Sequence, residues 1–278
     1  MRPSALAGRP AGWGSKAPMS AWALEFGTHV LGVAEAEVRK LRHDPWELAT
    51  RAVQPTLWLV IFGRVMAQVR GMPTGEMAYL DFMVPGILAQ SVLFVAIFYG
   101  ISAIWERDLG ILQKYLVSPA SRTALVLGKA LSAGVRALSQ AMIVYLLALA
   151  MGIRMSFQPL HILGVLAFIV LGAALFSTLS LIIACLVKTR ERFMGIGQVL
   201  TMPIFFASNA IYPLALMPGW LHVVSRANPL SYQVDALRAL MLPQAASVFG
   251  MITDVAVLTG TYAALVAVAA RLYPRMVT

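Results

Sequence analysis

Long apolar runs separated by short polar stretches dominate the pattern along this chain. A helix needs roughly 20 apolar residues to cross the hydrocarbon core of a bilayer. The runs at about 52–69, 80–104, 124–151, 160–187, 193–213 and 251–272 fit that length. The pattern therefore predicts an all-α integral membrane protein with six transmembrane helices, which occupy a domain at 49–278.

The N-terminal part has a different character. Residues 1–19 are rich in Pro, Gly, Ala and Ser and lack the apolar core of a signal peptide, so we expect a disordered cytoplasmic tail. Residues 20–48 place Val30, Val33, Ala34 and Val38 at helical spacing and end in a basic cluster before Trp46. This pattern favours an amphipathic interfacial helix over a solvated linker helix.

Residues 214–245 are apolar but are interrupted by several prolines. They predict two short helices, at about 218–226 and 231–242, broken at Asn228-Pro229. Neither is long enough to span, so we expect an outer re-entrant hairpin before the last span. Asp235 and Arg238 lie three residues apart and are expected to pair on one helix face.

The stretch 105–129 is the polar segment between the second and third spans. Such a segment cannot stay in hydrocarbon, so it must project from the bilayer and move with both spans. Leu109, Ile111 and Leu112 lie among charged residues, as in a short helix that docks in a groove of a soluble partner. A solvated loop is the alternative interpretation.

Composition agrees with a membrane protein, since 59% of residues are hydrophobic and 12% are charged. The net charge of +10 needs no nucleic acid partner. Most of the 22 Lys and Arg residues fall on the side that holds both termini, whereas Arg70, Arg154, Arg226 and Arg238 fall on the other. This bias predicts cytoplasmic N- and C-termini.

Several kinds of chemistry are missing from the sequence. It has no G-x-x-x-x-G-K-[ST] phosphate loop and no H-E-x-x-H metal motif. Its acids lie near span ends, which leaves little for a proton relay, and Cys185 is expected to be a buried small residue. We therefore expect no catalytic residue, no metal site and no cofactor site in this chain, and we expect its energy to come from outside.

A set of motifs carries a resemblance to a known family. Glu106-Arg107-x-x-Gly110-x-Leu112-x-Lys114 is followed by Ser118-Pro119-x-Ser121-Arg122 and Gly128-Lys129. Phe82-x-x-Pro85-Gly86, Pro218-x-Trp220, Asn228-Pro229 and Asp235-x-x-Arg238 occur further along. Together they resemble the membrane subunits (permeases) of type-2 ABC exporters, in particular daunorubicin-resistance-like drug efflux permeases, with nodulation-factor and polysaccharide exporters as relatives.

The resemblance implies a coupling helix at about 106–117 that docks on a separate ABC ATPase subunit. Two copies of the ATPase, with ATP and Mg, would join two copies of the permease. The location implied is the bacterial plasma (inner) membrane, in contact with lipid.

Candidate site residues fall into four groups. Those for ATPase coupling are Glu106, Arg107, Asp108, Gly110, Leu112 and Lys114. Those for a translocation path are Gln90, Ser91, Tyr99, Gln198, Ser208, Asn209 and Tyr212. Those for an outer gate are Pro218, Trp220, Asn228, Pro229, Asp235 and Arg238. Arg64 and Arg70 are candidates for an anionic cargo or lipid.

The expected function is ATP-driven export of a lipophilic or amphipathic substrate, such as a drug, an antibiotic, a glycolipid or a lipid-linked glycan. A permease for polysaccharide or lipo-oligosaccharide is the alternative within the family. A non-transporting membrane anchor and a lipid-modifying membrane enzyme are the alternatives outside it, and the missing acid, His and metal constellation disfavours the enzyme.

Overall fold

The computed structural model describes residues 45–68, 77–109, 122–187, 189–243 and 245–273, and the regular elements in these ranges are all helices. Within these ranges four helices are long and apolar enough to cross a membrane, namely Tyr79–Asp108, Leu125–Ala150, Pro159–Leu186 and Met251–Leu272. They coincide with the expected spans at 80–104, 124–151, 160–187 and 251–272. The all-helical fold is confirmed for the described residues, and the count of six spans stays a prediction.

The expected first span is a helix in three parts: α2 (Pro45–Thr56), the π-helical η1 (Leu57–Gly63) and α3 (Arg64–Ala67). Pro55 lacks an N–H, so the carbonyl of Arg51, four residues earlier, loses its helical donor. The side-chain amide of Gln140, on α7 (Arg122–Ala150), donates to that carbonyl at 3.2 Å. The π-helical turns of η1 begin two residues after Pro55.

The second span consists of α4 (Tyr79–Tyr99) and α5 (Ile101–Asp108), which meet at Gly100. At this joint the carbonyl of Ile97 accepts a hydrogen bond from the hydroxyl of Ser180 on α8 (Pro159–Leu186). A Cβ atom at residue 100 would overlap the Ser180 hydroxyl, so the close approach of the two helices requires glycine there.

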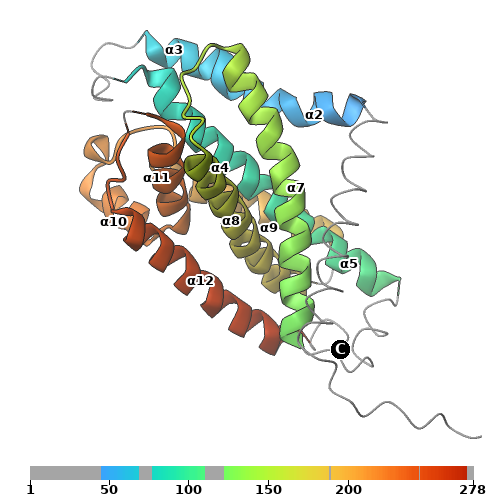
Figure 1. The fold of residues 1–278 in the computed structure, drawn as a ribbon. Coiled ribbons are helices and arrows are strands. Elements are labelled where there is room, and N and C mark those ends of the chain that lie inside the picture. Colours follow the sequence, from blue (N-terminus) through green and yellow to red (C-terminus); the bar gives the residue numbers. More distant parts are fainter. Residues whose placement is uncertain (1–44, 69–76, 110–121, 188, 244, 274–278) are drawn as a thin grey trace, which may run out of the picture.

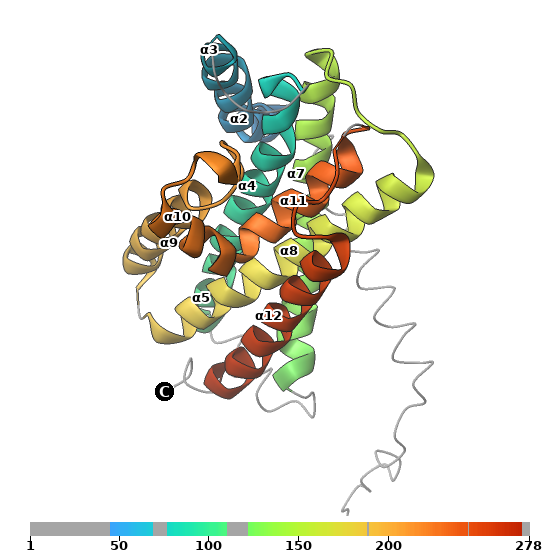
Figure 2. The same cartoon turned by 90° about the vertical axis from the view of Figure 1, so that its left-hand side faces the viewer.

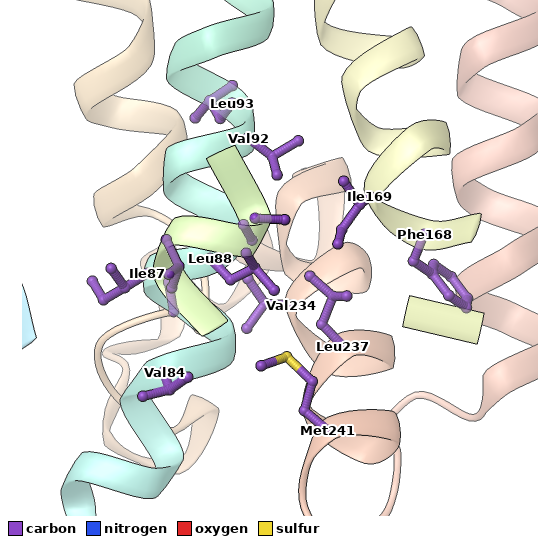
Figure 3. Close-up of a cluster of buried hydrophobic side chains, with 14 of the residues drawn as sticks. Val84, Ile87, Leu88, Val92, Leu93, Phe168, Ile169, Val234, Leu237 and Met241 are labelled. Atoms are coloured by element: carbon purple, nitrogen blue, oxygen red, sulfur yellow. The ribbon is translucent and has the colours of Figure 1, made fainter. Parts of the chain in front are cut away.

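The main core surrounds α11 (Pro229–Met241), which packs against α4, α8 and α12 (Met251–Leu272). Figures 1 and 2 show α11 lying among these longer helices. Figure 3 shows the apolar side chains that meet there: Val84, Ile87, Leu88, Val92 and Leu93 of α4, Phe168 and Ile169 of α8, and Val234, Leu237 and Met241 of α11. Because α11 is buried on nearly all sides, its polar residues must find partners inside the protein.

The expected fifth span is shorter than predicted, because α9 (Arg190–Phe206) ends at Phe206 and turns follow as far as Pro213. After the short η2 (Leu214–Leu216) come α10 (Gly219–Ala227) and α11, separated at Asn228. These two helices occupy the ranges expected for the short pair.

A second core cluster lies at the end of the bundle where α5, α7, α8, α9 and α12 meet, and it contains Ile104, Phe193, Cys185 and Tyr273. Cys185 is buried there, as the sequence predicts. The expected tail at 1–19, most of the interfacial helix at 20–48 and most of the coupling helix fall outside the described residues, and the domain boundaries stay predictions.

Candidate functional site

The end of α5 carries a network of charged side chains, which we call the α5 ion network: Glu106, Arg107, Asp108, Lys129 and Arg190. Lys129 Nζ of α7 lies 2.6 Å from Glu106 Oε2, and the two side chains are 16% and 26% exposed. Arg190, the first residue of α9, donates to Asp108 Oδ2 from Nε at 3.1 Å and from an Nη at 2.7 Å. The network therefore joins α5 to α7 and to α9.

Two further contacts extend the α5 ion network to neighbouring groups. Arg107 donates to the carbonyl of Val187 at 3.2 Å, just past the end of α8, where carbonyls lack helical partners. The guanidinium carbon of Arg190 lies 3.7 Å from the ring centre of Trp105, a cation–π geometry. The last turn of α5 thus contacts the end of α8, the start of α9 and, through Lys129, the first part of α7.

The structure places the coupling candidates unevenly. Glu106, Arg107 and Asp108 are all engaged with partners inside the chain. Gly110, Leu112 and Lys114 lie outside the described residues. Lys129 and Arg190 were missing from the sequence-based candidates, although Lys129 stands in the Gly128-Lys129 motif and Arg190 in a basic turn. Through this network, a displacement at the end of α5 can be transmitted to α7, α8 and α9 together.

The path candidates do not line one hollow. Gln90, Ser91, Ser208 and Asn209 are buried, whereas Gln198 is exposed on α9. Tyr99 borders a cavity of about 10 Å³, also lined by Ser102, Lys129, Ser177 and Thr178, which is room for about one water molecule. A larger, open apolar groove of about 600 Å³ lies between α7, α8 and α12, lined by Leu127, Leu131, Leu163, Leu166, Ala167, Val170, Leu171, Ala174 and Tyr262. None of the path candidates lines that groove.

Several candidates instead complete the hydrogen bonding at the end of α9. The carbonyl of Phe205 accepts from the Ser208 hydroxyl, and that of Phe206 accepts from the Tyr212 hydroxyl. The Asn228 amide donates to the carbonyls of Ile204 at 2.6 Å and Ala207 at 3.2 Å. Carbonyls in the last turn of a helix have no helical donors, so these side chains supply what the helix cannot.

Asn228 also begins α11, because its side-chain oxygen accepts from the N–H of Leu230 at 3.0 Å and Pro229 takes the first helical position. One side chain thus ends α9 and starts α11. Pro218 precedes α10, and Trp220 on α10 is 70% exposed. The outer-gate candidates therefore divide into a buried joint at Asn228 and an exposed surface at Trp220.

The expected pairing of Asp235 with Arg238 is wrong. The guanidinium of Arg238 donates to the carbonyls of Phe82 at 3.3 Å and Asn209 at 2.8 Å, and it lies 3.7 Å from the centre of the Phe82 ring. Asp235 accepts from Ser247 and from the N–H of Phe249. Arg238 therefore binds carbonyl groups of α4 and of the turn after α9 in place of the Asp235 carboxyl group. These contacts link α11 to α4 and to that turn.

Gly86 allows α4 to approach the same turn. A Cβ atom at residue 86 would overlap the backbone of Ala210, and Tyr79 at the start of α4 donates to the carbonyl of Ile211 at 2.8 Å. Of the two arginines considered for an anionic cargo, Arg64 is exposed on α3 and Arg70 lies outside the described residues.

Comparison with known proteins adds independent information. A family profile described as "ABC-2 type transporter" matches residues 28–242. The chain is 29% identical over 204 residues to a protein of Cyanophora paradoxa named as a transport permease, ycf38, with 72% of this chain and 70% of that protein covered. It is 26% identical over 200 residues to the daunorubicin resistance ABC transporter permease protein DrrB1 of Streptomyces coeruleorubidus, covering 72% of this chain and 70% of that one. It is 26% identical over 191 residues to nodulation protein J of Rhizobium leguminosarum bv. trifolii, covering 68% and 71%.

Proposed function

The chain belongs to the ABC-2 type transporter family, whose members are permease subunits rather than catalysts, and from that premise we propose that it exports an amphipathic substrate together with a separate ABC ATPase. ATP and Mg would bind to that ATPase. Two ATPase copies would drive two copies of this permease in a bacterial plasma membrane, with the termini in the cytoplasm.

The observation that carries the mechanism is the α5 ion network. The family resemblance implies docking of the ATPase on the segment at about 106–117, which begins within this network. Through Glu106 and Asp108, a displacement of that segment acts on α7 at Lys129 and on α9 at Arg190. The Asp108–Arg190 pair is exposed and adds little stability by itself. We assign it, together with the more buried Glu106–Lys129 pair, to coordinated movement rather than to holding the fold.

The proposed movement ends at the opposite side of the bundle. α9 is joined at its far end to α11 through Asn228, and α11 is joined to α4 through Arg238. We propose that α10 and α11 form a re-entrant outer gate, which yields when α9 and α4 move. For net export, one state of this cycle must bind the substrate better than the other.

The amphipathic nature of the substrate is inferred from two sources. The relative DrrB1 is named for daunorubicin resistance, which makes daunorubicin a suitable first probe. The open groove between α7, α8 and α12 is apolar and large enough for part of such a molecule. An anionic group on the substrate would favour contact with Arg64, and an Arg64→Gln variant with unchanged transport of acidic and neutral probes would contradict that assignment.

The test is reconstitution of the permease with its ATPase in inside-out vesicles. We expect uptake of a lipophilic probe that needs ATP hydrolysis. Glu106→Lys and Lys129→Glu should each lower the number of molecules moved per ATP, and the double variant should recover part of it because the opposite charges face each other again. Val199→Ala, at a side chain of α9 that is 74% exposed, is the control. If the purified pair hydrolyses ATP but moves no lipophilic substrate, the proposed function fails.

A further inference from the structure

Two carboxyl groups share a single hydroxyl where the middle of α11 meets the start of α12. Ser247 Oγ lies 2.8 Å from Asp235 Oδ2 and 2.9 Å from Asp254 Oδ2. Asp235 and Asp254 are both 0% exposed, whereas Ser247 is half-buried and is flanked by the exposed Val248. The two carboxyl groups are therefore shielded from water, whereas the serine lies close to the protein surface.

The Ser247 hydroxyl cannot donate a hydrogen bond to both carboxyl groups at once. A serine hydroxyl has one proton to donate and two lone pairs. The N–H of Gly250 donates to Ser247 Oγ at 2.7 Å and fills one lone pair. The hydroxyl proton can serve one carboxyl oxygen. The second contact, at hydrogen-bond length, then requires that the other carboxyl group carries a proton and donates it to the remaining lone pair.

The surroundings decide which carboxyl group carries that proton. Asp235 Oδ2 also accepts from the N–H of Phe249 at 2.9 Å, and Arg238 on the same helix lies within its electrostatic range. Both favour a charged Asp235. The Oδ1 atoms of both acids are buried without a partner, but Asp254 has Ser247 as its hydrogen-bonding partner among the described side chains and lacks a second donor such as the Phe249 N–H. Burial disfavours a second negative charge beside Asp235, so the proton belongs on Asp254.

Other titratable or charged groups stand on the helices packed around the site, and none of those described donates a hydrogen bond to either carboxyl group. They are Tyr79 and Asp81 of α4, Tyr145 of α7, His161 of α8, His222 and Arg226 of α10, Tyr232 and Arg238 of α11, and Tyr262 and Arg271 of α12. Several have partners elsewhere: Tyr79 with Ile211, His161 with Ser156, and Tyr232 with Arg226.

We propose that Asp254, Ser247 and Asp235 form a proton-binding clasp, in which one proton taken from the outer aqueous side holds α11 against α12. The chain of donors runs from Asp254 to Ser247 and from Ser247 to Asp235. Loss of the proton leaves two buried carboxylates in contact with one hydroxyl, which repel each other and separate the two helices. The clasp gives α11 a dependence on external pH that needs neither ATP nor the partner subunit.

A metal ion is the other ligand that two carboxyl groups suggest. The described part of the chain has no group of three or more His, Cys, Asp or Glu side chains that could hold one. The hydroxyl between the two acids also lies at hydrogen-bond distance from both, which suits a proton. Addition of Na⁺ or Ca²⁺ at constant pH distinguishes a metal ion from a proton at this site.

The test uses the full-length permease in lipid nanodiscs. Infrared difference spectra should show the carbonyl band of a neutral carboxylic acid at neutral pH. Asp254→Asn should remove that band, and Asp81→Asn, at the outer end of α4, should leave it. Amide exchange in 229–254, corrected for its intrinsic pH dependence, should show an opening constant that rises by up to about tenfold per pH unit between about pH 5 and pH 8, as expected for one bound proton.

The variants predict distinct outcomes. Asp254→Asn mimics the protonated acid, so the clasp stays closed and its exchange becomes independent of pH. Ser247→Ala, at a half-exposed position that tolerates the change, should open the clasp at every pH. Absence of the neutral-acid band in the wild type, flat exchange across the pH range, or protection that requires added Na⁺ or Ca²⁺ at constant pH would each overturn the proposal.

Discussion

Removing the Asn228 side chain should loosen two helices at once. In Asn228→Ala, α11 loses the acceptor for the Leu230 N–H, and α9 loses the donor to the carbonyls of Ile204 and Ala207. A lost N-cap costs about 1 kcal/mol. Each lost hydrogen bond to a carbonyl costs about 1 kcal/mol, and more where no water can replace it. We expect the free energy of unfolding to fall by about 2–4 kcal/mol.

A second variant separates the two parts of this loss. Asn228→Ser keeps an oxygen that can accept from the first turn of α11, but its side chain has no amide to reach α9. Its free energy of unfolding should therefore fall by about 1–2 kcal/mol, which is the contribution of the hydrogen bonds to the end of α9. Equilibrium unfolding in mixed detergent micelles measures both values, and Gln198→Ala on the exposed face of α9 gives the baseline.

The order of the variants is the informative result. If Asn228→Ser is as destabilising as Asn228→Ala, the cap on α11 contributes nothing and the magnitude given above is wrong. If both variants match the Gln198→Ala baseline, the contacts at Ile204 and Ala207 do not hold α9 to α11. In that case the proposed link between α9 and the outer gate has no physical basis.

Three further changes test other parts of the structure. Gly86→Ala should destabilise the permease by about 1–3 kcal/mol in the same unfolding assay, because the added methyl group overlaps the Ala210 backbone, whereas Gly195→Ala, which has open space around it, should not. Arg238→Met should lower the free energy of unfolding by about 3 kcal/mol or more, because it leaves the carbonyls of Phe82 and Asn209 without their donor; a loss below that of Arg64→Met, at an exposed site, would contradict the assignment. Gln140→Leu should speed amide exchange in α2, since it removes the side-chain donor that the Arg51 carbonyl receives where Pro55 has no N–H; exchange that matches the wild type would show that this contact does not stabilise α2.

The features of the fold that depend on the local pattern of residues could be predicted from the sequence. The spans at 124–151, 160–187 and 251–272 follow from apolar length, and the break between α10 and α11 follows from Asn228-Pro229. It could not predict partners that are distant in the chain. Asp235 and Arg238 have the spacing of a helical ion pair, yet backbone groups from three other segments bind them instead.

The candidate site shows the same division. The position of the polar stretch after the second span is evident from the sequence, because hydrocarbon excludes it. Lys129 and Arg190 as partners of Glu106 and Asp108 depend on how α5, α7 and α9 meet in space. Ser208 and Tyr212 were chosen as polar residues in an apolar region, and the same property makes them suitable to satisfy the carbonyls at the end of α9.

The joint at Gly100 constrains how this sequence can vary. Its bend depends on an absent side chain at residue 100 and on a hydroxyl at residue 180, which serves the Ile97 carbonyl. A larger residue at 100 displaces the hydroxyl, and a residue without a hydroxyl at 180 leaves the Ile97 carbonyl with the Gly100 N–H, at 3.3 Å, as its remaining donor. The two positions should therefore change together among relatives, and in a mutagenesis screen suppressors of a defect at residue 100 should occur at residue 180.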